Sequence, residues 1–360
     1  MKKLVLAAAA VVLTGAHLSI PASAVSGGST LPNGSHPFVA RIHSEGVGCT
    51  GALIDPEWVI TAAQCFPGSG STPTTPTTVN VGNANLGTGT GQVVKVTGLV
   101  RRTDRDVVLA KLERPVLDVT PIALSRTAPV QGEPLSVVGF GRTATDWVPD
   151  RPRLATFSVT ALGATTASLT GENGVDTCKG DAGGPAFRMV GGRPELVAVN
   201  STSWQHGCLL VTETRQGSTE ARTDDIVTWI HQQFPSKRIR NYNTLCADLG
   251  SNAVGTPVVM ATCQPGHWLS QLWRLPGDGT IRNYNGLCMD LGSNAVGTPV
   301  VIATCQPGSW ASQQWTVREN RTISNYNGLC MDLDSNAVGT RIVMVTCQPG
   351  TWPSQQWTVA

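Results

Sequence analysis

Apolar residues recur along the chain in short runs, such as residues 107–110 (VVLA) and 257–260 (PVVM), with glycine and threonine between them. Short runs rich in valine and threonine favour short strands joined by tight turns over long amphipathic helices. One longer uninterrupted run covers residues 4–13, which is too short to span a bilayer. The pattern therefore predicts a protein built mainly of strands.

The long apolar run has the setting of a signal peptide. Lys2 and Lys3 precede it, and Ala22-Ser23-Ala24 forms a small-residue cleavage site after it. We therefore expect residues 1–24 to be removed and the chain to be secreted, without a membrane span. Ten cysteines, an even number, should pair in the oxidising environment that a secreted chain meets.

The C-terminal third consists of three copies of one segment, at residues 241–273, 283–315 and 325–357. Corresponding cysteines and tryptophans recur every 42 residues, as Cys246, Cys288 and Cys330 do. A unit of this size cannot bury a core alone, so the three copies should pack about a pseudo-threefold axis. Two cysteines 17 residues apart in each copy make three disulfides within repeats the natural pairing: Cys246–Cys263, Cys288–Cys305 and Cys330–Cys347.

Each copy carries Leu-Cys-x-Asp near its start and Gln-x-Trp at its end, as in residues 245–248 and 271–273. This pattern resembles the ricin-B lectins (carbohydrate-binding family 13). The resemblance implies a β-trefoil over residues 239–360, in which Trp273, Trp315 and Trp357 belong to the core.

The same resemblance implies glycan binding through the aspartate that follows the first cysteine of each copy, Asp248, Asp290 and Asp332. The family's aromatic platform, two residues before the second cysteine, is replaced here by Ala261, Ala303 and Val345. Each copy has an additional tryptophan in a Cys-Gln-Pro-Gly-x-Trp turn: Trp268, Trp310 and Trp352. These rings either stack on sugars in place of the platform or form a hydrophobic plug under the turn.

The N-terminal part contains four motifs in a fixed order: residues 49–65, ending Thr-Ala-Ala-Gln-Cys; residues 106–112; residues 176–185, containing Gly-Asp-Ala-Gly-Gly; and residues 203–208. Together they resemble the trypsin-like (S1, chymotrypsin-fold) serine proteases across residues 25–233. The resemblance implies two six-stranded antiparallel barrels with the active site between them, and the disulfides Cys49–Cys65 and Cys178–Cys208. Residues 234–238 would link this domain to the trefoil.

Two of the three catalytic positions of this family are substituted. The mechanism needs a hydroxyl nucleophile, an imidazole base and a carboxylate that orients the imidazole. Asp106 fills the carboxylate position, whereas Gln64 stands at the histidine position and Ala182 at the serine position. An amide has no usable pKa near neutrality and a methyl group is not a nucleophile, so we expect a catalytically inactive domain.

Other parts of the machinery match the family. Gly180 and Ala182 would supply the oxyanion-hole N–H groups. Val25, which opens a Val-Ser-Gly-Gly start after the predicted cleavage site, would pair through its ammonium with Asp181. Asp176 would form the floor of the specificity pocket, whose remaining predicted members are Ser203, Trp204 and Gln205. Gln205 replaces the usual glycine and would narrow the mouth of the pocket or cap Asp176.

Composition limits the partners. A net charge of +2, without a long run of lysine or arginine, argues against nucleic acid. No spacing of histidines and cysteines indicates a metal site, and no cofactor is implied. We expect a monomer that binds glycan through the trefoil and a protein with an exposed Lys or Arg in the protease-like cleft. Two hypotheses compete with this pseudoprotease: an active serine endopeptidase with a carbohydrate-binding module, and a lectin with a protease-shaped spacer.

Overall fold

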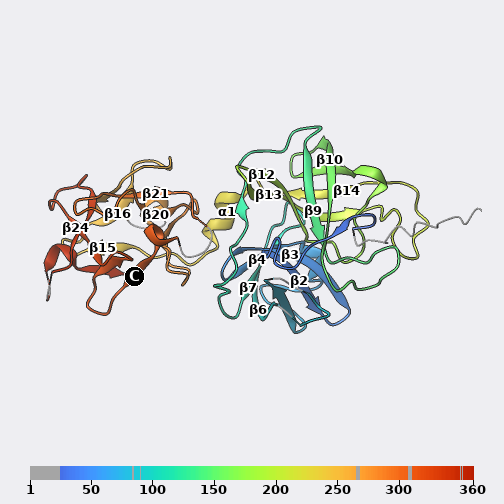
Figure 1. Cartoon of the computed structure of the whole chain (residues 1–360), viewed down its shortest axis with the longest axis horizontal. Coiled ribbons are helices and arrows are strands. Elements are labelled where there is room, and N and C mark those ends of the chain that lie inside the picture. The colour runs from blue at the N-terminus through green and yellow to red at the C-terminus, as the bar shows by residue number, and fades with distance from the viewer. Residues whose placement is uncertain are drawn as a thin grey trace, which may run out of the picture.

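The computed structural model describes residues 25–82, 85–89, 91–264, 268–306, 310–348, 350 and 352–360, so the predicted signal peptide lies outside the described residues. Figure 1 shows two groups of strands, with the chain passing from the two barrels on the right through the short helix α1 (Val227–Gln232) to the trefoil on the left. None of the described helices is long and apolar enough to cross a membrane.

The first barrel is closed by six antiparallel strands in the order β2-β3-β4-β7-β6-β5. Valine, isoleucine and leucine side chains point inward from each strand and form its core. Its strands are β2 (Val39–Ser44), β3 (Val47–Asp55), β4 (Trp58–Thr61), β5 (Thr77–Val81), β6 (Gln92–Arg101) and β7 (Val108–Leu112). A short 3₁₀ helix, Ala63–Cys65, follows β4 and carries Gln64.

The second barrel runs β9-β10-β11-β14-β13-β12 and closes because β9 pairs with both β10 and β12. β1 (Ser29–Thr30) adds to β10, and β8 (Ala123–Leu124) adds to β13. The barrel strands are β9 (Pro134–Gly139), β10 (Arg153–Leu162), β11 (Thr166–Gly171), β12 (Pro185–Val190), β13 (Arg193–Ser203) and β14 (Ser218–Arg222), with a 3₁₀ helix at Glu172–Gly174. The predicted double barrel is therefore confirmed.

The trefoil consists of three four-stranded sheets, one for each repeat. The first sheet joins the two ends of the domain, because Ile239 pairs with Val359 near the C-terminus. Its strands are β26 (Trp357–Val359), β15 (Ile239–Asn241), β16 (Cys246–Leu249) and β17 (Val258–Ala261); the second sheet has β18 (Trp273–Arg274), β19 (Arg282–Asn283), β20 (Cys288–Leu291) and β21 (Val300–Ala303); the third has β22 (Trp315–Val317), β23 (Ile323–Asn325), β24 (Leu329–Leu333) and β25 (Ile342–Thr346). The 3₁₀ helices Leu269–Gln271, Ala311–Gln313 and Pro353–Gln355 precede the closing tryptophans.

The core of the trefoil confirms the interpretation of the Gln-x-Trp tryptophans. Trp273, Trp315 and Trp357 are buried, and each indole N–H donates a 3.0 Å hydrogen bond to the carbonyl of Ala247, Met289 or Met331, respectively. A buried indole needs such a partner for its single donor. All five expected disulfides are present: Cys49–Cys65, Cys178–Cys208, Cys246–Cys263, Cys288–Cys305 and Cys330–Cys347.

A buried ion pair joins the trefoil to the first barrel. Nη2 of Arg274 lies 2.6 Å from Oδ2 of Asp55, and both side chains are almost fully enclosed. The guanidinium also lies 3.9 Å from the centre of the Phe234 ring, in the segment that follows α1. Arg126 adds a hydrogen bond to Asn285 at 2.6 Å. The two domains therefore contact each other through specific polar groups.

The first repeat departs from the other two at this contact. Leu269, Leu272 and Arg274 line a cavity between the domains, with a volume of about 660 Å³. The matching positions hold Ala311, Gln314 and Thr316 in the second repeat and Pro353, Gln356 and Thr358 in the third. Because the repeats otherwise share these segments closely, the three differences mark residues that serve domain docking rather than the trefoil fold.

Candidate active site and lectin sites

The three catalytic positions come together between the barrels. Gln64 lies just after β4, Asp106 just before β7 and Ala182 just before β12. The backbone N–H of Gln64 donates to Oδ1 of Asp106 at 2.9 Å. Gln64 and Ala182 line one cleft of about 290 Å³ with Gly180, Ser201, Ser203 and Gln205, which we call the central cleft.

The Gln64 amide is held by acceptors alone. Its Nε2 donates to Oδ2 of Asp106 at 2.8 Å and to the carbonyl oxygen of Ser201 at 2.6 Å. Since both partners only accept here, they fix the orientation of the amide, with Nε2 turned toward Asp106. Gln64 thus satisfies the carboxylate as an N–H donor, but its amide cannot take up a proton.

Ser201 makes a third hydrogen bond to the Asp106 carboxylate. The Ser201 hydroxyl donates to Oδ2 of Asp106 at 2.7 Å. Ser203, a predicted member of the specificity pocket, donates to the carbonyl of Thr177 at 2.6 Å. The sequence Ser-Thr-Ser at residues 201–203 gave no signal of which serine contacts Asp106.

The loop of Gly180 to Ala182 is the predicted oxyanion hole. Gly180 has φ +105°, and a side chain there would meet Cα of Gly141 at 2.8 Å, so glycine is required. Thr50 ties the loop to the first barrel, since its hydroxyl donates to Gly180 O and its N–H to Ala182 O, both at 2.9 Å. Among the described residues, no acceptor takes the N–H of Gly180 or of Ala182.

Asp181 is fully buried behind this loop. Its carboxylate accepts the N–H groups of Gly141 and Cys178, both at 2.7 Å, and burial raises its pKa to about 7. Val25 is buried in the core of the second barrel with φ +40°, an unfavourable conformation for a β-branched residue. In the uncleaved chain the nitrogen of Val25 is an amide, so pairing of its ammonium with Asp181 stays a prediction for the mature protein.

Asp176 is the residue expected at the floor of the specificity pocket. The residue is fully buried and is not part of the lining of the central cleft. Its carboxylate accepts the N–H groups of Thr177 at 2.9 Å, His206 at 3.0 Å and Gly217 at 3.4 Å. Burial raises its pKa, and these backbone hydrogen bonds oppose the rise. The backbone of the neighbouring loops thus encloses the carboxylate.

The other predicted pocket residues do not all line the same depression. Ser203 and Gln205 line the central cleft, whereas Trp204 lines an adjoining depression with Gln216 and Gly217. Arg215 stacks on the Trp204 ring at 3.6 Å. Gln205 has φ +63° and accepts a hydrogen bond from Arg142 at 2.8 Å, so it does not cap Asp176.

Each repeat of the trefoil places its candidate aspartate and exposed tryptophan around one glutamine. The Gln271 side chain donates to Oδ2 of Asp248 at 2.8 Å, and its backbone N–H donates to Trp268 O at 3.0 Å. The same two bonds recur at Gln313 with Asp290 and Trp310, and at Gln355 with Asp332 and Trp352. Asp248 and Asp290 are partly accessible, whereas Asp332 is buried.

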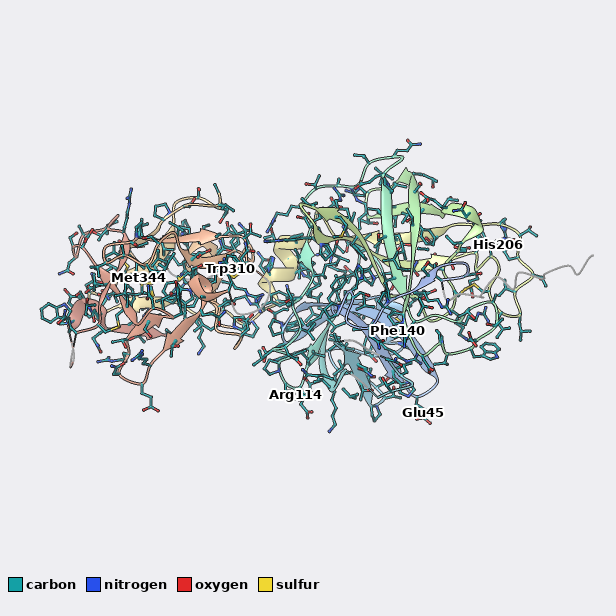
Figure 2. All side chains as sticks on the ribbon, in the orientation of Figure 1. Glu45, Arg114, Phe140, His206, Trp310 and Met344 are labelled. Atoms are coloured by element: carbon teal, nitrogen blue, oxygen red, sulfur yellow. A yellow bond between two sulfur atoms is a disulfide. The ribbon has the colours of Figure 1, made fainter. Side chains whose placement is uncertain are left out.

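The additional tryptophans are not hydrophobic plugs. Trp268, Trp310 and Trp352 are 52 %, 54 % and 52 % exposed, respectively, and Trp310 is labelled in Figure 2. An exposed indole face is free to stack on a pyranose ring, whereas a plug would be enclosed. Within the described residues, no group of histidine, cysteine and acidic side chains has the arrangement of a metal site.

Comparison with known proteins identifies both domains. The sequence model of the trypsin family matches residues 25–230, more than half of the chain. The chain belongs to the trypsin family. Residues 235–359 match the model of the ricin-type β-trefoil lectin domain. The protein is therefore a trypsin domain fused to a ricin-type lectin domain.

The trypsin domain is similar to several animal proteins. "Protein C activator" of Agkistrodon piscivorus leucostoma is 28 % identical over 209 residues, which cover 47 % of this chain and 77 % of the relative. "Inactive snake venom serine proteinase 13" of Crotalus adamanteus is 31 % identical over 191 residues, 45 % of this chain and 70 % of the relative. The solved structure of mouse neuropsin matches 57 % of this chain and 98 % of its own, at 20 % identity and a TM-score of 0.48.

Proposed function

We propose that the protein is a secreted pseudoprotease that binds a polypeptide in its central cleft without cleaving it, while the lectin domain attaches it to glycan. The arrangement at Gln64 carries this proposal. Its amide occupies the place of a general base and donates both Nε2 hydrogens to acceptors, Asp106 and Ser201. With Ala182 at the nucleophile position, neither of these two catalytic positions carries a nucleophile or a base.

Binding of a peptide without turnover is supported by the backbone groups beside the substituted catalytic positions. No acceptor among the described residues takes the N–H groups of Gly180 and Ala182, so these groups can receive a peptide carbonyl. Gly180 holds its backbone in the left-handed conformation that this loop requires. The relative from Crotalus adamanteus has the word inactive in its own name, which agrees with such a role. The enclosure of Asp176 gives less support to a bound Lys or Arg side chain, which would need an accessible carboxylate.

Attachment to carbohydrate is supported by the repeated unit of aspartate, glutamine and exposed tryptophan. Trp268 with Asp248 and Trp310 with Asp290 offer a stacking face near an accessible carboxylate. Three weak sites on one rigid domain would bind a polymer more tightly than any single site. The five disulfides agree with an extracellular location.

A fluorophosphonate probe, which forms a bond with an activated serine, tests the proposal. We expect no labelling of the wild type, of Gln64→His or of Ala182→Ser, and labelling only of the double variant Gln64→His/Ala182→Ser. Nucleophile and base act as a unit, and loss of either in a related triad lowers kcat by roughly 10⁶-fold. Labelling of the wild type at any serine of the central cleft would overturn the proposal.

A further inference from the structure

A second depression continues the central cleft and has basic walls. It has a volume of about 300 Å³, and its lining includes Arg41, His43, Arg142, Trp147 and Lys179; we call it the basic groove. Phe140, labelled in Figure 2, also lines it. The basic groove and the central cleft share the wall formed by Val47, Gly48, Cys49, Lys179 and Gly180. A ligand in one can therefore extend into the other.

The cations of the basic groove lack acidic partners. Among the described residues, Arg41, Arg142 and Lys179 form no ion pair. The Nη2 atom of Arg41 lies 3.6 Å from where a Cβ on Gly48 would be, so the guanidinium reaches the shared wall. Arg142 is held by Gln205 at 2.8 Å and lies 5.5 Å from the Trp147 ring, which fixes its position at the rim.

The residues that line the central cleft and the basic groove favour a negatively charged ligand. Neither depression includes an aspartate or glutamate among the described residues that form it. Trp147 is 59 % exposed and Val148 56 % exposed, so apolar surface lies beside the cations. Nε of Arg142 is buried without an acceptor. Three cations without an ion-pair partner among the described residues, beside exposed apolar side chains, fit a carboxylate-bearing segment that also presents hydrophobic contacts.

We propose that the basic groove holds the acidic part of a polypeptide ligand whose neighbouring residues lie in the central cleft. This inference rests on the proposed binding function of the central cleft. The central cleft, which contains Ser203, Gly180 and Ala182, and the basic groove share one wall and so form a continuous channel. A polypeptide suits this channel better than a sulfated sugar, because its backbone supplies a carbonyl for the N–H groups of Gly180 and Ala182.

Three pools of fluorescent eight-residue peptides test the inference on the immobilised full-length protein. They have the form X-X-X-X-Z-Z-X-X, where X is an equal mixture of amino acids and Z is Glu, Gln or Lys. We expect the Glu pool to be retained about tenfold more than the Gln pool and the Lys pool less than either, with the preference weakened by 0.5 M salt. In Arg41→Gln/Arg142→Gln/Lys179→Gln, retention of the Glu pool should fall to that of the Gln pool.

The control variant, Arg240→Gln/Arg318→Gln/Arg341→Gln, removes three exposed cations from the lectin domain and should keep the preference for Glu. Equal retention of the Glu and Gln pools by the wild type would overturn the inference and leave the proposed function intact. Retention of no pool would overturn both. Binding of a heparin fragment through the three cations, without any preference among the peptide pools, would assign the basic groove to a sulfated polysaccharide and overturn the inference.

Discussion

Replacing Arg274 by threonine should separate the lectin domain from the trypsin domain without unfolding either. Threonine is the residue that the second and third repeats carry at the matching positions, Thr316 and Thr358. The trefoil fold itself therefore tolerates threonine there. The same substitution removes the partner of Asp55, which is 0 % exposed and has Oδ2 of its carboxylate 2.6 Å from the guanidinium.

The free-energy cost of Arg274→Thr follows from the small number of partners that the Asp55 carboxylate has. Its Oδ1 accepts the N–H of Glu57 at 3.1 Å, but Oδ2 depends on Arg274. Removing one member of a buried ion pair costs about 3–5 kcal/mol, because the remaining charge is neither hydrated nor paired. Loss of the contact between Arg274 and the Phe234 ring adds roughly 1 kcal/mol. Opening the interface lets water reach Asp55, so the loss should appear as undocking rather than as unfolding.

Calorimetry and limited proteolysis measure this effect. The wild type should unfold with coupled transitions and resist cleavage at residues 234–237, whereas Arg274→Thr should show two independent transitions and rapid cleavage there. Asp55→Asn/Arg274→Thr should recover part of the docking, since the stranded charge is gone. Arg282→Thr, which removes an arginine paired with Asp278 inside the trefoil, should leave docking unchanged. Unchanged transitions and cleavage in Arg274→Thr would refute the role of the buried pair.

The remaining predictions concern the lectin sites, a buried acid and Asp176. Trp268→Ala/Trp310→Ala/Trp352→Ala should weaken retention on an insoluble polysaccharide by at least about 100-fold, while Trp147→Ala, which removes an exposed tryptophan of the trypsin domain, should bind as the wild type does. Burial raises the pKa of Glu220 from 4.5 to about 7, so between these pH values the folded state keeps a proton that the unfolded state loses. The free energy of unfolding should therefore fall by about 3 kcal/mol between pH 4.5 and 7. Denaturant titration should show a smaller loss in Glu220→Gln. Benzamidine should raise the Tm of neither the wild type nor Gln205→Gly, because backbone N–H groups enclose Asp176; a saturable rise that Asp176→Ser abolishes would contradict this enclosure.

Features fixed by local spacing could be predicted from the sequence. The 42-residue register predicted the trefoil disulfides and the buried tryptophans, since two cysteines 17 residues apart within each repeated unit make pairing inside the unit the natural choice. The motifs around Gln64, Asp106 and Ala182 located the catalytic positions because the closed barrels bring these segments together. The repeats and the order of the motifs were therefore enough to predict the disulfides, the buried tryptophans and the catalytic positions.

Features that depend on loop conformation could not be predicted. The positive φ of Gln205 and the enclosure of Asp176 by three backbone N–H groups arise from the loop between β13 and β14, where the chain departs from the family pattern. The basic groove gathers Arg41, Arg142 and Lys179 from separate segments, so no local pattern reveals it. Arg274 did leave a signal, since the first repeat alone has an arginine at its position.

Prolonged incubation with a mixed peptide pool tests the central claim most directly. The purified wild type, Asp106→Ala and Gln64→His/Ala182→Ser are each kept for several days with the X-X-X-X-Glu-Glu-X-X pool, and the peptides are examined by mass spectrometry. We predict that the wild type retains the peptides and returns them intact, as Asp106→Ala does, while the double variant cleaves them. Cleavage products from the wild type that disappear in Asp106→Ala would contradict it.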